Sequence, residues 1–291
     1  MSERHEIDAF TGTATTGHEW DGVRELNTPL PRWWLWIFYG TIVWSIGYWI
    51  VYPSWPLISG YTHGVFGWQS RNAVVNEIAG LRAIRGPMAD KLAAASLQEI
   101  VADPQLLEFA RAQAKPIFNE NCAACHGAGG AGAKGYPNLN DDEWLWGGKL
   151  DDIVITIRHG VRSGDPKTRL GGMPAFGRDG MMKRADIETV ADYARSIAHL
   201  PIDPKADLAA GKKVYAEVCA ACHGAEGKGN RELGAPNLTD SIWLYGSDKP
   251  AIVDGLVNGH AGVMPAWAAR LDDSTIKALT VYVHTLGGGE K

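Results

Sequence analysis

One hexapeptide, Cys-Ala-Ala-Cys-His-Gly, occurs twice in the sequence, beginning at Cys122 and again at Cys219. The two copies use all four cysteines of the 291-residue chain. The pattern C-x-x-C-H is the attachment signature of c-type haem. A zinc site would bring its cysteine pairs together as one tetrahedral set, and a thioredoxin-like pair does not require the histidine. The motif therefore predicts two covalently bound haem c groups.

Each copy supplies its own attachment residues. Two thiols one helical turn apart form thioethers with the haem, and the next histidine is the proximal iron ligand. The residues predicted for these roles are Cys122, Cys125 and His126 in the first copy, and Cys219, Cys222 and His223 in the second.

The repetition extends well beyond the hexapeptide, which indicates a duplicated domain. An aromatic residue lies four positions before each first cysteine, Phe118 in one copy and Tyr215 in the other. Each copy ends in a segment with the apolar period of an amphipathic helix. The other matched segments are Pro137-Asn138-Leu139 with Pro236-Asn237-Leu238, and Met173-Pro-Ala with Met264-Pro-Ala.

A methionine is the expected distal iron ligand in each copy, because methionine with histidine raises the reduction potential and suits electron transfer. Met264 is the only methionine after Cys219. In the first copy, the Met-Pro-Ala repeat selects Met173 over Met181 and Met182. Spacing leaves open whether each methionine serves its own copy or whether two packed domains exchange them.

His159 and His260 are the rival distal ligands, and they would give bis-histidine haems of lower potential. They do not correspond in the repeat, because aligning Gly160 with Gly259 places His159 opposite Asn258. The repeat therefore favours the methionines.

The order of these features resembles the class I cytochrome c fold, with an N-terminal helix, C-x-x-C-H, a glycine-rich loop, a methionine loop and a closing helix. This resemblance implies a mainly α chain with two tandem domains, 105–202 and 203–291.

Residues 33–52 form an uncharged segment of the length that a helix needs to cross a bilayer. Tryptophan and tyrosine crowd both of its ends, as in the aromatic belts of membrane interfaces. We expect one transmembrane helix here, after an N-terminal segment 1–32. A connecting segment 53–104 follows, in which residues 71–101 have an amphipathic pattern with a break expected at Gly86-Pro87.

The orientation of this helix follows from charge and chemistry. Arg24 and Arg32 precede the span and only Arg71 follows it closely, which weakly favours a cytoplasmic N-terminus. In bacteria, haem c is attached on the periplasmic side. The haem domains are therefore expected in the periplasm, anchored to the inner membrane.

The N-terminal motifs resemble those of the dihaem subunits (CcoP or FixP) of cbb3-type cytochrome c oxidases. They include Thr16-Gly-His-Glu-Trp20-Asp-Gly22, Pro29-Leu-Pro31-Arg-Trp-Trp-Leu-Trp and Tyr52-Pro-Ser-Trp-Pro56. The resemblance implies a subunit that takes electrons from a periplasmic or membrane-bound cytochrome c and passes them to the oxygen-reducing haem-copper subunit in aerobic or microaerobic respiration. A monohaem cytochrome c subunit is the other implied partner.

Composition and motifs exclude several other functions. A net charge of -5 argues against nucleic-acid binding. The chain carries no catalytic constellation of its own, so it is not expected to be an enzyme in isolation. The alternatives that remain open are a free-standing membrane-tethered dihaem shuttle and a haem sensor or enzyme with an open sixth position.

Residues 105–291 contain 21 basic and 23 acidic side chains, and haem propionates would add negative charge, which suits a basic electron donor.

Overall fold

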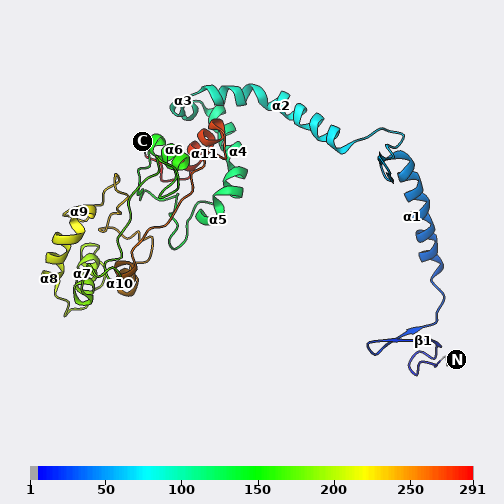
Figure 1. Cartoon of the computed structure of the whole chain (residues 1–291), viewed down its shortest axis with the longest axis horizontal. Coiled ribbons are helices and arrows are strands. Elements are labelled where there is room, and N and C mark those ends of the chain that lie inside the picture. Colours follow the sequence, from blue (N-terminus) through cyan, green and yellow to red (C-terminus); the bar gives the residue numbers. More distant parts are fainter. Residues whose placement is uncertain (1–5, 291) are drawn as a thin grey trace. The chain divides into compact units, whose positions relative to one another are not determined.

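The computed structural model describes residues 6–290 and is mainly helical, as predicted (Figure 1). Its contacts divide it into two units, 6–84 and 85–290, which are described separately below. Residues 1–5 and 291, at the ends of the predicted segments 1–32 and 203–291, lie outside the described residues.

The first unit begins with a β-hairpin that the sequence analysis did not predict. Strands β1 (Thr15–Trp20) and β2 (Val23–Leu26) pair antiparallel, with Trp20 opposite Val23. The turn residues Asp21 and Gly22 have φ values of 48° and 84°. Two consecutive positive φ values are typical of the type I′ turn that Asp-Gly favours, so this dipeptide was the available signal.

Helix α1 (Arg32–Val51) confirms the apolar helix expected over 33–52, displaced by one residue. None of its residues is buried within the structure, and it is long and apolar enough to cross a membrane. A small hairpin of β3 (Pro56–Leu57) and β4 (Gly60–Tyr61) follows it.

Helix α2 (Ser70–Ala94) corrects the expected break at Gly86-Pro87, because it continues through both residues. Proline in a helix leaves the carbonyl four positions earlier, here that of Ala83, without its partner. This stretch of α2 is largely exposed, so water can satisfy that carbonyl. The boundary between the two units falls within α2, after Ile84.

The second unit contains the two copies of the repeat. Helix α3 (Leu97–Ala102) precedes the first copy. The helices of the first copy are α4 (Pro104–Asn121), α5 (Ala123–His126), α6 (Leu150–His159) and α7 (Arg184–Ile197). Those of the second copy are α8 (Leu208–Val214), the π-helical turn η1 (Tyr215–Cys219), α9 (Ala220–His223), α10 (Lys249–Asn258) and α11 (Asp273–His284).

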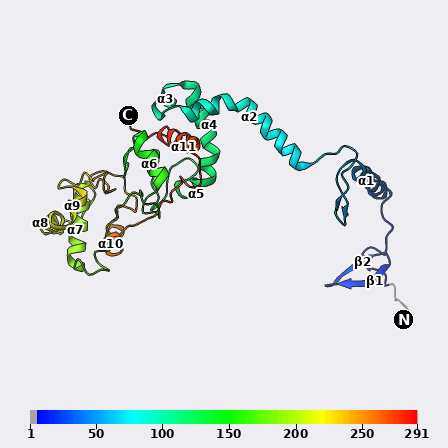
Figure 2. The same ribbon diagram turned by 45° about the horizontal axis from the view of Figure 1, so that its top comes forward.

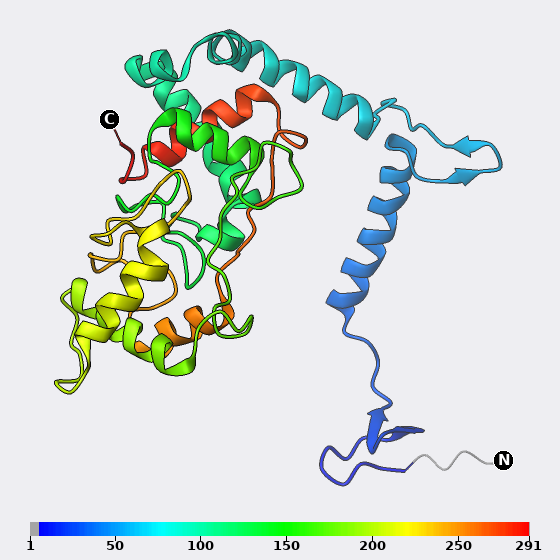
Figure 3. The ribbon, with the colours of Figure 1, turned by 60° about the vertical axis from the view of Figure 1, so that its left-hand side comes forward.

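The two copies exchange their closing helices. Helix α11, from the second copy, packs on α4 and α6 of the first, whereas α7, from the first copy, packs on α8 and α10 of the second. Figure 2 shows these two groups of helices apart, and in Figure 3 the red α11 lies among green and teal helices. The expected domains 105–202 and 203–291 therefore describe the sequence repeat, while each packed half combines both copies.

Two apolar clusters form the cores of these halves. The first cluster includes Ala110, Ala114, Phe118, Ile153, Ile157, Ile276, Leu279 and Tyr282, and the second includes Ile187, Val190, Ala191, Tyr215, Val253 and Leu256. In each, an aromatic ring of the first helix contacts one of the exchanged helix. The ring centroids are 5.3 Å apart both for Phe118 with Tyr282 and for Tyr193 with Tyr215.

Ion pairs also join the copies. Arg158 of α6 lies 3.0 Å from Asp273 of α11, and Lys249 of α10 lies 2.7 Å from Asp192 of α7. The Asp192 side chain is 9% exposed, so the second pair is better shielded from water and salt than the first.

Candidate haem-binding sites

Both C-x-x-C-H motifs lie in short helices that directly continue the first helix of their copy. Cys122 follows α4 and caps α5, and Cys219 ends η1 before α9. In each motif the first cysteine is partly buried and the second, Cys125 or Cys222, is exposed. Burial raises the pKa of the Cys122 and Cys219 thiols to about 11, so both are neutral in the protein without haem.

Each motif histidine is held by the carbonyl of a proline in the repeated Pro-Asn-Leu segment. The Nδ1 atom of His126 lies 2.9 Å from the Pro137 carbonyl oxygen, and that of His223 lies 2.9 Å from the Pro236 carbonyl oxygen. With Nδ1–H donated to the carbonyl, Nε2 carries the free lone pair that a metal needs. Burial lowers the pKa of His223, which favours the neutral, metal-binding ring.

This contact gives the Pro-Asn-Leu repeat a role that the sequence analysis left unassigned. Its proline carbonyls fix the tautomer and orientation of the predicted proximal ligands. Repetition of the tripeptide, 11 residues after His126 and 13 residues after His223, was the sequence signal for it.

The glycine-rich loops hold these segments close to the motifs. The amide of Gly132 donates to the His126 carbonyl at 2.7 Å, and that of Gly229 donates to the His223 carbonyl at 2.9 Å. Both glycines have positive φ, and a Cβ at either would lie 2.5–2.7 Å from backbone atoms of the Pro-Asn-Leu region. Only glycine fits such a backbone conformation at so close an approach.

Each predicted distal methionine packs against the cluster that contacts the first cysteine of the other copy. Met264, from the second copy, packs against the first cluster, which also contacts Cys122. Met173, from the first copy, packs against the second cluster, which also contacts Cys219. Each cluster is thus contacted by one motif cysteine and one methionine, and the motif histidine that follows is oriented by a proline carbonyl. This donor set matches haem c with histidine and methionine ligands.

The rival histidines have other partners. The Nδ1 atom of His159 lies 3.1 Å from an Asp165 carboxylate oxygen. The ring of His260 stacks on Tyr245, with centroids 3.6 Å apart, and its backbone pairs with Met173. The described residues contain no group of three or more His, Cys, Asp or Glu side chains placed to hold a metal ion by themselves.

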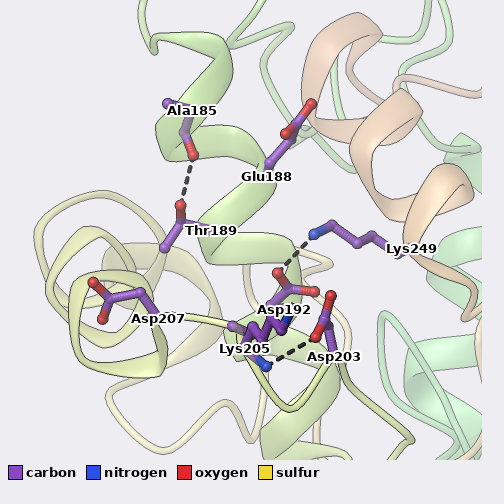
Figure 4. A pocket seen from close by; sticks show the side chains of 9 residues that line it. Ala185, Glu188, Thr189, Asp192, Asp203, Lys205, Asp207 and Lys249 are labelled. Atoms are coloured by element: carbon purple, nitrogen blue, oxygen red, sulfur yellow. Dashed lines mark hydrogen bonds and ion pairs between the residues drawn. The ribbon is translucent and has the colours of Figure 1, made fainter.

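A shallow polar pocket lies away from the cysteine motifs, beside α7 (Figure 4). Asp192 and Lys249, which form an ion pair, line this pocket together with Asp203, Lys205 and Asp207 from the segment between α7 and α8. It contains none of the predicted site residues, and its main feature is the ion pair that joins the two copies.

Three protein-family models match the chain. They are described as the N-terminal domain of cytochrome oxidase-cbb3, FixP, over residues 12–59; cytochrome c, over 112–198; and cytochrome c oxidase, cbb3-type, subunit III, over 206–283.

Similar curated proteins extend over the whole chain. The cbb3-type cytochrome c oxidase subunit FixP of Bradyrhizobium sp. (strain ORS 278) is 61% identical, and that of Bradyrhizobium diazoefficiens is 60% identical, each with 100% of both chains covered. The subunit CcoP of Azospirillum brasilense is 52% identical over 98% of this chain and 99% of its own.

Proposed function

Because the chain belongs to the FixP and CcoP family of cbb3-type cytochrome c oxidase subunits, and is therefore a membrane-anchored electron-transfer subunit of that oxidase, we propose that it carries electrons on two haem c groups. One haem is attached at Cys122 and Cys125 and the other at Cys219 and Cys222. The duplicated motif and the matched loops around it support this number.

The haem at Cys122 and Cys125 has His126 as proximal ligand and Met264 as distal ligand. The haem at Cys219 and Cys222 has His223 and Met173. The observation that carries this exchanged pairing is the packing of each methionine in the apolar cluster that contacts the other copy's first cysteine. The domains 105–202 and 203–291 are accordingly sequence repeats, each contributing a histidine to one haem and a methionine to the other.

Bound haem c supplies an iron that alternates between the ferrous and ferric states. The chain holds the ligands in place, so that little rearrangement accompanies the change of charge. The Pro137 and Pro236 carbonyls orient the two imidazoles. The methionines pack against apolar clusters, and an apolar environment raises the cost of the ferric charge, which favours a high potential.

The remaining topology follows the predictions from the sequence. The segment before α1 lies in the cytoplasm, α1 crosses the inner membrane, and residues 53–104 connect it to the haem region in the periplasm. Electrons arrive from a cytochrome c donor and leave toward the oxygen-reducing haem-copper subunit, beside a monohaem cytochrome c subunit. Protease protection of residues 105–291 in right-side-out vesicles would contradict this orientation.

The ligand pairing is tested by removing one haem and replacing one methionine. In a chain carrying Cys219→Ser and Cys222→Ser, only the haem at Cys122 and Cys125 remains. Met264→His in this background should abolish the red charge-transfer band of ferric methionine-ligated haem and lower the potential. Met173→His is the matched control and should leave both unchanged. The opposite pattern would show that each methionine serves its own copy.

A further inference from the structure

The two methionine loops run alongside each other where the copies exchange. The backbone of Met264 pairs with that of Val161 through two hydrogen bonds of 3.0 Å, and Met173 pairs with His260 through bonds of 2.9 and 3.0 Å. The backbone of each methionine is therefore held in place by a segment from the other copy.

One arginine joins both loops at equivalent positions. The Nε atom of Arg162 donates to the carbonyl oxygen of Gly262 at 2.6 Å, and its Nη1 atom donates to the carbonyl oxygen of Gly171. Gly262 lies two residues before Met264, and Gly171 lies two residues before Met173. A single guanidinium thus binds the same backbone position in each loop.

The repeat provides no second arginine of this kind. With Gly160 aligned to Gly259, the position equivalent to Arg162 is occupied by Ala261. Arg162 also has a φ of 51°, which is uncommon for a residue with a side chain. Such a conformation persists only where the surroundings hold it, and here the bonds to both loops do so.

We propose that Arg162 is a positioning residue for both distal methionines, holding the two ligand loops together so that both haems keep methionine ligation. This inference rests on the haem ligands proposed above. The guanidinium is suited to the role because its planar fork donates in two directions at once, whereas the lysine ammonium is a single point charge. Hydrogen bonds from a charged donor are also stronger than neutral ones.

The test uses the full-length, haem-loaded chain with Arg162→Ala and Arg162→Lys. Arg184→Ala is the matched control, because the Arg184 guanidinium is exposed and, within the described part of the chain, its ion pair is with Glu188 one turn away. Imidazole is added to the ferric protein, and displacement of methionine is followed as loss of the red charge-transfer band. Haem content per chain is measured on every sample.

Arg162→Ala should increase the apparent imidazole affinity about tenfold across the whole band, which corresponds to about 1.4 kcal/mol. Arg162→Lys should give a smaller increase, and Arg184→Ala none. A biphasic titration in which half of the band keeps its normal affinity would overturn the proposal, since only one loop would then depend on Arg162. An unchanged titration would overturn it as well.

Two further results keep the conclusion clear. If Arg162→Ala does not accumulate with haem, Arg162→Lys decides the question, and normal imidazole affinity in that variant counts against the proposal. If the unmodified chain has no charge-transfer band, or does not contain two haems, the proposed ligands themselves are wrong, and the role of Arg162 fails with them.

Discussion

Replacing Ile276 by alanine tests the exchange of the closing helices without relying on the haem. Ile276 lies in α11, is 0% exposed and belongs to the first cluster. Its counterpart in the repeat is Ile187 in α7, which is 1% exposed and belongs to the second cluster. Truncating a buried isoleucine to alanine costs about 2–5 kcal/mol, which includes the cavity that is left.

Because α11 packs on α4, Ile276→Ala should destabilise α4, more than 150 residues earlier in the chain. Hydrogen exchange followed by mass spectrometry measures this directly, and a loss of about 2 kcal/mol corresponds to roughly 30-fold faster exchange. Ile187→Ala is the matched comparison and should accelerate exchange in α8. If Ile276→Ala loosened α8 and spared α4, the exchange would be refuted.

Two further predictions concern a helix cap and the electron donor. Asp272 caps α11, and hydrogen bonds from Ser274 and the Thr275 amide lower the pKa of its carboxyl. The contribution of this cap to stability is therefore fully present above the ordinary pKa of 3.8 and is lost as the pH falls through the lower pKa of the folded state. Asp272→Ala should lower the free energy of unfolding by about 1 kcal/mol at pH 7 and by less near pH 3, and Asp272→Asn should lower it by less than Asp272→Ala at pH 7. Urea unfolding at both pH values measures these differences. Equal stability of the unmodified chain and both variants at pH 7 would contradict the prediction. Electron uptake from a basic cytochrome c should slow as ionic strength rises, because residues 105–291 carry net negative charge, and a stopped-flow rate that is flat over a tenfold range of salt would count against electrostatic steering.

The local elements around the haem sites could be predicted because their chemistry is local. The order of Cys122, Cys125 and His126 is set by one turn of helix, and α1 agrees with the predicted span to one residue. The hairpin of β1 and β2 was not predicted, because its strands are short and largely exposed and have no clear apolar alternation. The Asp21-Gly22 dipeptide is a recognised hairpin signal.

The exchange could not be predicted, because the two copies present nearly equivalent surfaces. Ile187 and Ile276 occupy the same position of the closing helix, and Phe118 and Tyr215 occupy the same position of the first helix. Periodicity identifies an apolar face without identifying the copy that covers it. The role of Arg162 was missed for the related reason that its two carbonyl partners become neighbours only in the exchanged arrangement.

The exchange of closing helices also affects how the protein matures. A chain that is synthesised from its N-terminus presents α4 and the first C-x-x-C-H motif long before α11, which ends at His284. The ring of Phe118 therefore lacks its contact with the ring of Tyr282 until almost the whole chain has been synthesised. The helix that leads into the first motif therefore lacks its packing partner α11 until synthesis is nearly complete. A premature stop codon shortly before α11 would thus damage the half of the molecule that was synthesised first.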